Sequence, residues 1–461
     1  MGYYYQSCFA GLVVLCAILL ASQPTRRAQL KGEKEKKQRS SSGNDGEHPE
    51  KYWYKAYALV MGADWLQGPY LYSLYKDEHG LSDGLVSTLF MTGFMSGAVS
   101  AYFVGAVSDK YGRKLVCMIY CVLYALSCFC TIIPSVPMLF LGRGLGGIST
   151  SILFSVFDSW MVTNFRERKL VEDGCDLSRT YATTSTINSL SAIMSGVVSE
   201  LLVRFTGSRK SPFLLAAALL WLGLQVIWSH WMENFGAEAA VKKSEISKVS
   251  TNGKNAKDLD DQDKPKPAST VWSTITRPSI LALGFASTMF EGSMYLFVFF
   301  WTPALKSVQK SPGEELPYGF IFASFMATAM AAALTFNIVT QRRLVKCSRL
   351  LVGVLLVANF SFVKLAGPKT EDAAFWLSCL FEAAVGMYWP CMGYLKGRLI
   401  EDDARAKVYG IMRVPLNVFV VGALMFVGDD TSHIRVFSGC SVLLTAGFAV
   451  MWAASMKVGM P

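Results

Sequence analysis

Residues 105–114, with the sequence GAVSDKYGRK, form a short polar run between two long apolar stretches near 84–107 and 115–133. Each stretch is about 20 residues long, and a helix of that length crosses a hydrocarbon core of about 30 Å. The polar run is therefore predicted to be a tight loop at a membrane surface.

Two charged residues of this loop are predicted to form a conformational latch. Asp109 and Arg113 can make a charge-assisted contact between neighbouring helices. Gly112 is expected to allow a tight turn, and Gly105 to allow close helix packing. The alternative is a charge cluster that only sets the orientation of the chain in the membrane.

The whole chain is too apolar for a soluble protein. Of its 461 residues, 52% are hydrophobic and 17% are charged, whereas soluble domains carry about 25% charged residues. A soluble enzyme, a disulfide scaffold and a disordered chain are thereby excluded. Membrane-spanning segments are expected near residues 2–22, 52–75, 84–107, 115–133, 136–161, 182–205, 212–232, 278–304, 318–340, 348–366, 373–395, 406–428 and 433–456.

The formal charge of +10 is spread over loops in a pattern that predicts the topology. The loops rich in Lys and Arg alternate along the chain and cover residues 23–51, 108–114, 162–181, 233–277, 341–349 and 396–407. The positive-inside rule places these loops and the C-terminus in the cytosol, with the basic loop 204–211 as the exception. Basic residues scattered in this way do not predict a nucleic-acid interface, which would gather them on one face.

The first apolar segment, 2–22, has two interpretations. A cleaved signal peptide would carry its positive charges before the apolar run, whereas here Arg26, Arg27 and Lys31 follow it. We therefore expect an uncleaved anchor helix with its N-terminus outside the cytosol.

The polar stretch 233–277 divides the remaining twelve segments into six and six. We expect an anchor helix and basic cytosolic segment over 1–51, a six-helix bundle over 52–232, a disordered cytosolic linker over 233–277 and a second six-helix bundle over 278–461. This plan resembles the major facilitator superfamily. The run at 105–114 is similar to that superfamily's G-x-L-x-D-R-x-G-R-R/K motif, with Val107 in place of Leu. The predicted fold is therefore all-α: two six-helix bundles plus one extra N-terminal transmembrane helix.

A second motif lies in the segment 136–161, where Arg143 is followed by small residues on one helical face, at 146, 147, 150 and 151. Small residues let helices approach closely in lipid. The motif resembles the superfamily's Arg-x-x-x-Gly pattern, which implies a role for Arg143 in proton coupling.

Charged residues inside membrane segments are candidates for function because each is costly in lipid. Asp64, Glu291 and Glu382 are candidate proton carriers, whereas Asp158 and Glu200 lie nearer segment ends and favour structural roles. Arg413, one turn before Asn417, offers paired donors to a tetrahedral oxyanion. The alternative is that Arg413 neutralises Glu382 or Glu291.

Several longer runs resemble the molybdate-anion transporter family. They are ADWLQGPYLY at 63–72, GRGLGGISTSILFSVFDSW at 142–160, FEG at 290–292 through WTP at 301–303, YGFIFASFM at 318–326 and MRVPL at 412–416. The resemblance covers essentially the whole chain and implies molybdate uptake by a secondary transporter.

Molybdate is a dianion at neutral pH, and its entry against about 100 mV costs roughly 4.6 kcal/mol. Two or more coupled protons would cancel that charge, and the chain has no Walker A loop for ATP. We expect Arg413 and Asn417 to bind the anion, with Gln67 and Tyr295 as neutral donors. Protons on Asp64 or Glu291 would then control the rocking of the bundles, which the loop at 105–114 would latch.

Other functions stay open at this point. The solute could be a sulfate-like oxyanion or a sugar, although a neutral sugar does not require Arg413. A non-transporting membrane sensor is a further alternative. An enzyme, a metal site or a cofactor is not expected, because the four histidines show no ligand spacing. We expect a monomer in the lipid bilayer of the plasma membrane.

Overall fold

The computed structural model describes residues 2–23, 49–167, 177–236, 268–311, 314–342, 344–400, 402–425 and 432–457, and these ranges contain helices and no strand. Ten of the described helical segments are long and apolar enough to span a membrane. Three further helices, α3 (Pro49–Gln67), α16 (Glu371–Leu399) and α17 (Asp402–Met425), occupy the other predicted positions. The predicted all-α polytopic fold is confirmed.

The N-terminal bundle begins with α3 and continues through residue 230. Its other elements are α4 (Leu71–Ser73), a π-helical turn η1 (Leu74–Glu78), α5 (Asp83–Tyr111), α6 (Arg113–Ile132), α7 (Val136–Leu153), α8 (Val156–Glu167), α9 (Leu177–Thr206) and α10 (Ser211–His230). The segments expected at 52–75 and 136–161 are thus each divided into shorter helices.

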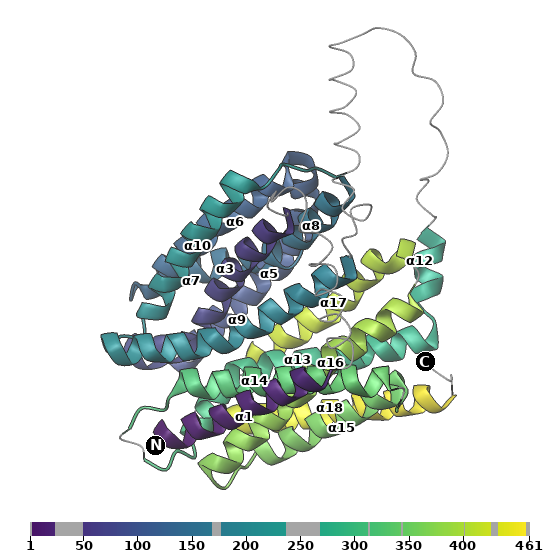
Figure 1. Cartoon of the computed structure of the whole chain (residues 1–461). Coiled ribbons are helices and arrows are strands. Elements are labelled where there is room, and N and C mark those ends of the chain that lie inside the picture. Colours follow the sequence, from purple (N-terminus) through teal and green to yellow (C-terminus); the bar gives the residue numbers. More distant parts are fainter. Residues whose placement is uncertain are drawn as a thin grey trace, which may run out of the picture.

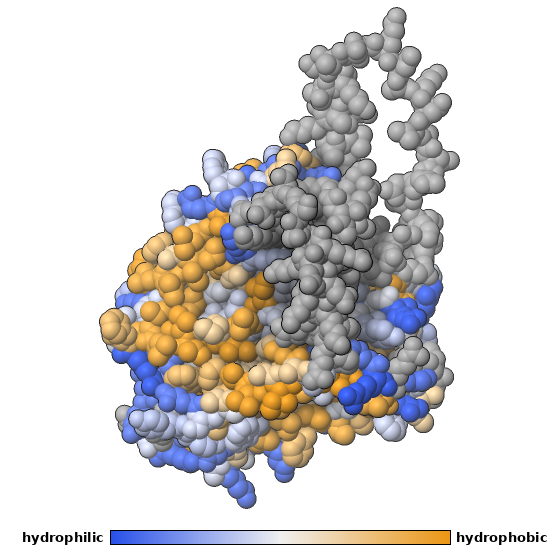
Figure 2. All heavy atoms as spheres, viewed as in Figure 1, coloured by the Kyte–Doolittle hydropathy of each residue, from blue (hydrophilic) through white to orange (hydrophobic). Residues whose placement is uncertain are grey.

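The C-terminal bundle contains α16 and α17 together with four more helices, which are α13 (Pro278–Lys306), α14 (Tyr318–Gln341), α15 (Cys347–Leu365) and α18 (Ser432–Lys457). In Figure 1 the two bundles lie side by side and meet along α9 and α14 and along α5 and α17. The visible outer face is broadly hydrophobic, with hydrophilic residues gathered at its margins, as a bilayer requires (Figure 2).

Two helices lie outside this six-plus-six plan. The N-terminal helix α1 (Gly2–Ser22) packs along α14 of the C-terminal bundle, and the short α12 (Ala268–Ile275) packs on α17 (Figure 1). α12 falls within the stretch expected to be a disordered linker, so the end of that stretch is helical. Residues 237–267 of the expected linker lie outside the described residues.

Successive helices alternate in direction, which gives the molecule two ends. We call the end where α10 stops and α12 begins the linker end, and the opposite end the far end. The topology predicted from the basic loops places the linker end in the cytosol.

Small residues bring the helices together, as the stripe after Arg143 predicts. A Cβ built on Gly147 of α7 would lie 2.2 Å from the backbone oxygen of Gly93 and 2.8 Å from the nitrogen of Gly97, both on α5. In the C-terminal bundle a Cβ on Gly386 would lie 2.0 Å from the Ala329 oxygen. These helix pairs therefore touch backbone to backbone, which leaves no room for a side chain.

Candidate functional site

A cluster of polar side chains surrounds Glu291 on α13. The carboxylate Oε1 accepts hydrogen bonds from Ser287 Oγ at 2.6 Å and from Tyr388 Oη at 2.7 Å. Lys396 Nζ of α16 lies 3.6 Å from the same oxygen and donates to Ser287 Oγ at 3.1 Å. Glu291 is 8% exposed and the Lys396 side chain 17%, so the ion pair lies largely inside the bundle.

Arg413 of α17 lies at the edge of this cluster. Its guanidinium interacts electrostatically with Lys396 and with Tyr295 of α13. Arg413 is exposed, and within the described part of the chain it has neither a hydrogen bond nor a salt bridge. Of the two hypotheses for Arg413, neutralisation of Glu291 is not what the structure shows, because Lys396 is the cation paired with that carboxylate.

The close approach of α17 to α13 explains how these groups meet. A Cβ on Gly284 would lie 3.3 Å from the Met412 side chain, and one on Gly292 would lie 2.2 Å from the Phe419 ring. Both glycines therefore admit side chains of α17 to the surface of α13. Arg413 follows Met412 directly, which places its backbone near Gly284, about one turn before Ser287 on α13. Asn417, one turn further on, is half-buried on the same helix.

Aromatic side chains from both bundles separate this cluster from the far end. The Tyr295 ring packs edge-on against Phe94 of α5, with centroids 5.2 Å apart. One turn along α13, Phe299 contacts Phe90 at 4.8 Å and Tyr72 at 5.6 Å. We call these five residues the aromatic barrier.

Polar ties join the two bundles beyond that barrier, at the far end. Lys306 Nζ lies 2.6 Å from Asp77 Oδ1, and Arg209 Nη2 lies 2.6 Å from Glu315 Oε1. Burial lowers the pKa of Arg209, but Glu315 and Asp77 outweigh this effect and the pKa is raised. Each tie pairs a residue of one bundle with a residue of the other.

Glu200 reinforces the far end from inside, as its structural interpretation predicts. Its carboxylate accepts from Tyr70 Oη at 2.7 Å and from the Gly319 backbone N–H at 2.9 Å, and pairs with Arg204 at 2.7 Å. Gly319 belongs to the other bundle, and a Cβ there would lie 2.3 Å from the Gly196 oxygen. The α9–α14 seam is therefore closed by backbone contact.

Other predicted substrate and coupling residues lie apart from the Glu291 cluster. Gln67 is buried at the last residue of α3, and its side-chain amide donates within its own helix to the Ala63 oxygen at 3.3 Å. Asp64 accepts from Tyr124 Oη of α6 at 2.7 Å, inside the N-terminal bundle. Neither contact brings the residue to Arg413.

Glu382 of α16 is 5% exposed, and among the described residues its carboxyl group has no hydrogen bond or salt bridge. Neutralisation by Arg413 is therefore not observed for this carboxyl either. An ionised carboxylate buried without a partner is costly, so this site favours the neutral acid.

Arg143 contacts the aromatic barrier at Phe90. Its Nε donates to the Leu89 oxygen at 3.3 Å, and its guanidinium lies 4.9 Å from the centre of the Phe90 ring. A Cβ on Gly93 would come within 2.5 Å of Arg143 Nη2, so the glycine makes room for the guanidinium. The conformation of Arg143 is thus tied to a residue that touches the other bundle.

The loop at 105–114 forms the expected pair. Arg113 Nε and Nη2 donate to Asp109 Oδ1 at 3.0 and 2.8 Å. Arg113 also bonds to the Ser159 oxygen at 3.2 Å and to Thr163, both on α8. The contact therefore joins α5, α6 and α8 within one bundle.

The two glycines of this loop behave differently. Gly112 has φ +113, and a Cβ there would lie 2.5 Å from the Glu233 carboxylate carbon. Gly105, by contrast, faces open space, so the expectation of close helix packing at Gly105 is not met.

Sequence reasoning missed two residues, Glu233 and Lys396. The Glu233 carboxylate accepts from the backbone N–H groups of Lys114 at 2.8 Å and Leu115 at 3.1 Å, which caps the start of α6. No local pattern marks this long-range cap. Lys396 was assigned to a cytosolic loop, whereas α16 extends to Leu399. The available signal was its position two turns after Tyr388 on the same helix.

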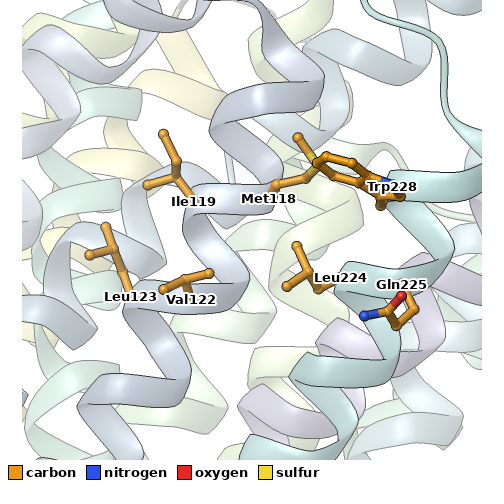
Figure 3. Close-up of a pocket in the computed structure, with 7 residues that line it drawn as sticks. All are labelled: Met118, Ile119, Val122, Leu123, Leu224, Gln225 and Trp228. Atoms are coloured by element: carbon orange, nitrogen blue, oxygen red, sulfur yellow. The ribbon is translucent and has the colours of Figure 1, made fainter.

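An apolar groove of about 560 Å³ lies between α6 and α10, on the outer surface of the N-terminal bundle (Figure 3). Its lining residues are Met118, Ile119, Val122, Leu123, Leu224, Gln225 and Trp228. The side-chain polar groups of this lining are the Gln225 amide and the Trp228 indole N–H, and neither is charged, so the groove suits lipid and not an ionic solute. Within the described residues, no group of three or more Cys, His, Asp and Glu side chains is placed to hold a metal ion.

Comparisons with known proteins agree with the fold. A major facilitator family model described as sugar transporters with 12 transmembrane segments matches residues 4–367. The chain is 28% identical over 415 residues to the molybdate-anion transporter of Takifugu rubripes, covering 85% of this chain and 84% of that protein. It is 29% identical over 434 residues to that of Danio rerio, covering 86% and 85%.

Solved transporter structures share the architecture at low identity. A peptide transporter POT aligns with a TM-score of 0.67 and 15% identity, covering 90% of this chain and 96% of that chain. The nucleoside transporter NupG aligns with a TM-score of 0.61 and 14% identity, covering 87% and 99%. At these identities the likeness concerns the fold alone, whereas the family match covers most of the chain. The chain therefore belongs to this major facilitator family, and it is a membrane transporter and not an enzyme.

Proposed function

We propose that this transporter moves molybdate into the cytosol by alternating access. The observation that carries the proposal is that the Arg413 guanidinium has no hydrogen bond or salt bridge within the described part of the chain. The neighbouring carboxylate, Glu291, is paired with Lys396 instead. A guanidinium offers paired donors that match a tetrahedral oxyanion, and it remains charged at any physiological pH.

The relatives named molybdate-anion transporter support molybdate as the oxyanion. The family description as sugar transporters is the competing indication. A sugar is neutral and gains little from a guanidinium, so the positive charge of Arg413 favours the anion.

The distribution of contacts supports alternating access. The aromatic barrier and the ion pairs Lys306–Asp77 and Arg209–Glu315 connect the bundles on the far side of Arg413. This arrangement fits a state in which the anion site communicates with the linker end. Rocking of the bundles would break these ties and expose the site at the far end.

Proton coupling is the part of the proposal that supplies the driving force. Inward movement of a dianion against about 100 mV costs roughly 4.6 kcal/mol, which accompanying protons can offset. Asp64, Glu291 and Glu382 are the proposed carriers. Arg143 would link proton movement to the barrier through Phe90, and the Asp109–Arg113 pair would stabilise one of the two states.

The experiment measures cellular molybdenum by mass spectrometry in molybdate-starved cells that express the protein. Wild type is compared with Arg413→Ala at matched surface levels, with and without excess sulfate. We expect uptake that resists sulfate in wild type, and a loss of about tenfold or more in Arg413→Ala, because hydrogen bonds to a charged group contribute about 1.5–3 kcal/mol.

The matched control is Arg398→Ala, which removes an exposed guanidinium that lies over the Tyr394 ring on α16. It is expected to transport like wild type. Wild-type protein at the cell surface that accumulates no molybdenum would contradict the proposal. A sugar series tested on the same cells would then be the next measurement.

A further inference from the structure

Lys396 of α16 is paired with Glu291 of α13 at 3.6 Å and also interacts electrostatically with Arg413 of α17. Lys396 and Arg413 each carry one positive charge, and Glu291 carries one negative charge when ionised. The sum is +1 with Glu291 ionised and +2 with Glu291 protonated. A tetrahedral dianion carries two negative charges, which neutralise the +2 of the form with Glu291 protonated.

The contacts of Lys396 show that its ion pair with Glu291 is a weak tie. The separation of 3.6 Å is longer than an ordinary charge-assisted hydrogen bond of about 2.8 Å. The ammonium group has three donors, and among the described residues its one hydrogen bond goes to Ser287 Oγ at 3.1 Å. Lys396 Nζ also lies 5.6 Å from the centre of the Tyr409 ring. Lys396 can therefore turn towards a second anion without a large loss.

The contacts of Glu291 show that its carboxyl group keeps hydrogen-bond partners when Lys396 moves away. Ser287 and Tyr388 both donate to Oε1 at distances below 2.8 Å. Hydroxyl groups also accept hydrogen bonds, so the same two partners can accommodate a protonated carboxyl group. Among the described residues, the charged and titratable groups that face Glu291 are Tyr388 and Lys396 on α16, Arg413 on α17 and Tyr295 on its own helix. On α18, the Cys440 thiol is hydrogen-bonded to Ser293 of α13, two residues after Glu291.

We propose that Lys396 and Arg413 form a two-cation clamp for a tetrahedral dianion, and that Glu291 is the internal anion that competes for Lys396. This inference rests on the proposed function and adds to it a second binding residue, a charge rule and a proton count. A dianion in the clamp leaves a net charge of −1 beside an ionised Glu291 and zero beside a protonated one. Because an uncompensated buried charge is costly, binding of the dianion takes up one proton at Glu291.

The charge rule distinguishes dianions from monoanions of the same shape. A tetrahedral monoanion such as perrhenate balances the clamp with Glu291 ionised, so it binds without a proton. Molybdate or tungstate binds with one proton. Dianion affinity should therefore weaken by about tenfold per pH unit once Glu291 is ionised in the free protein, whereas monoanion affinity should not.

The test uses the purified full-length protein and displacement of labelled molybdate by tungstate and by perrhenate, from mildly acidic to mildly alkaline pH. Lys396→Gln should lower the ratio of tungstate to perrhenate affinity by about tenfold or more, because one cation is lost. Lys396→Arg should restore that ratio. Glu291→Gln should keep tungstate affinity and remove its pH dependence.

The matched control is Arg398→Gln, two residues along α16 and exposed, which should leave the ratio unchanged. If Lys396→Gln retains the wild-type ratio, or if Glu291→Gln retains the wild-type pH dependence, the clamp is wrong while molybdate transport stands. If the wild-type protein binds neither anion, the proposed function fails and the clamp with it. Should Lys396→Gln not fold, the Glu291→Gln variant still decides the question, because the clamp requires it to lose the pH dependence of tungstate binding.

Discussion

At the scale of single residues, Gly112 shows how a glycine is fixed by both backbone and neighbours. Its φ of +113 is a conformation that L side chains rarely adopt, and a Cβ would lie 2.5 Å from the Glu233 carboxylate carbon. Gly112→Ala is expected to destabilise the protein by about 2 kcal/mol, through backbone strain and the displaced cap of α6. The measurement is thermal unfolding in detergent.

Gly105→Ala is the control, because a Cβ there meets open space. Equal melting of the two variants would show that the turn tolerates a side chain.

At the scale of elements, α1 is held to the C-terminal bundle by a few specific contacts. Tyr5 Oη donates to Glu371 Oε1 at 2.5 Å, and Cys16 Sγ lies 3.1 Å from the Ala327 oxygen. Tyr5→Phe is expected to weaken the docking of α1 by about 2 kcal/mol, because a hydrogen bond to a charged group is lost. The rate of thiol labelling at the buried Cys16 reports this docking, and it should rise about tenfold or more.

Tyr3→Phe, at an 87% exposed position, should label like wild type. An unchanged rate in Tyr5→Phe would mean that packing along α14 alone holds the helix.

At the scale of the whole molecule, the far-end ion pairs bias the balance between conformations. Lys306→Gln removes the tie to Asp77 across the bundles, whereas Lys310→Gln removes a pair with Asp372 inside the C-terminal bundle. A partly exposed pair contributes about 0.5 kcal/mol, so Lys306→Gln should raise the population open at the far end about twofold. Spin labels at the exposed Phe205 and Lys369 would measure this as a larger long-distance fraction. Lys310→Gln should leave the distances unchanged, and a shift of equal size in both variants would refute the gating role of Lys306.

The sequence by itself determined the features that depend on local chemistry. Apolar runs of membrane length predict helices because lipid offers no partners to an open backbone. The pair Asp109 and Arg113 was predictable because the two residues lie only four positions apart on the chain. The stripe after Arg143 was predictable because its spacing puts small residues on one face, where α5 now packs.

Only the tertiary structure decided which charged groups meet. Arg413 was recognised as a candidate, but whether it pairs with Glu291 depends on the neighbours that α13 acquires from distant parts of the chain. In the structure, Lys396 pairs with the Glu291 carboxylate, and the Gln67 amide donates to a carbonyl of its own helix. Glu382 has no partner among the described residues. The physical reason is that ion pairs form over a few ångströms, whereas helix packing brings together residues that are more than a hundred positions apart. Intramembrane charge in the sequence therefore indicates where function lies, and the packing of helices decides which residues share it.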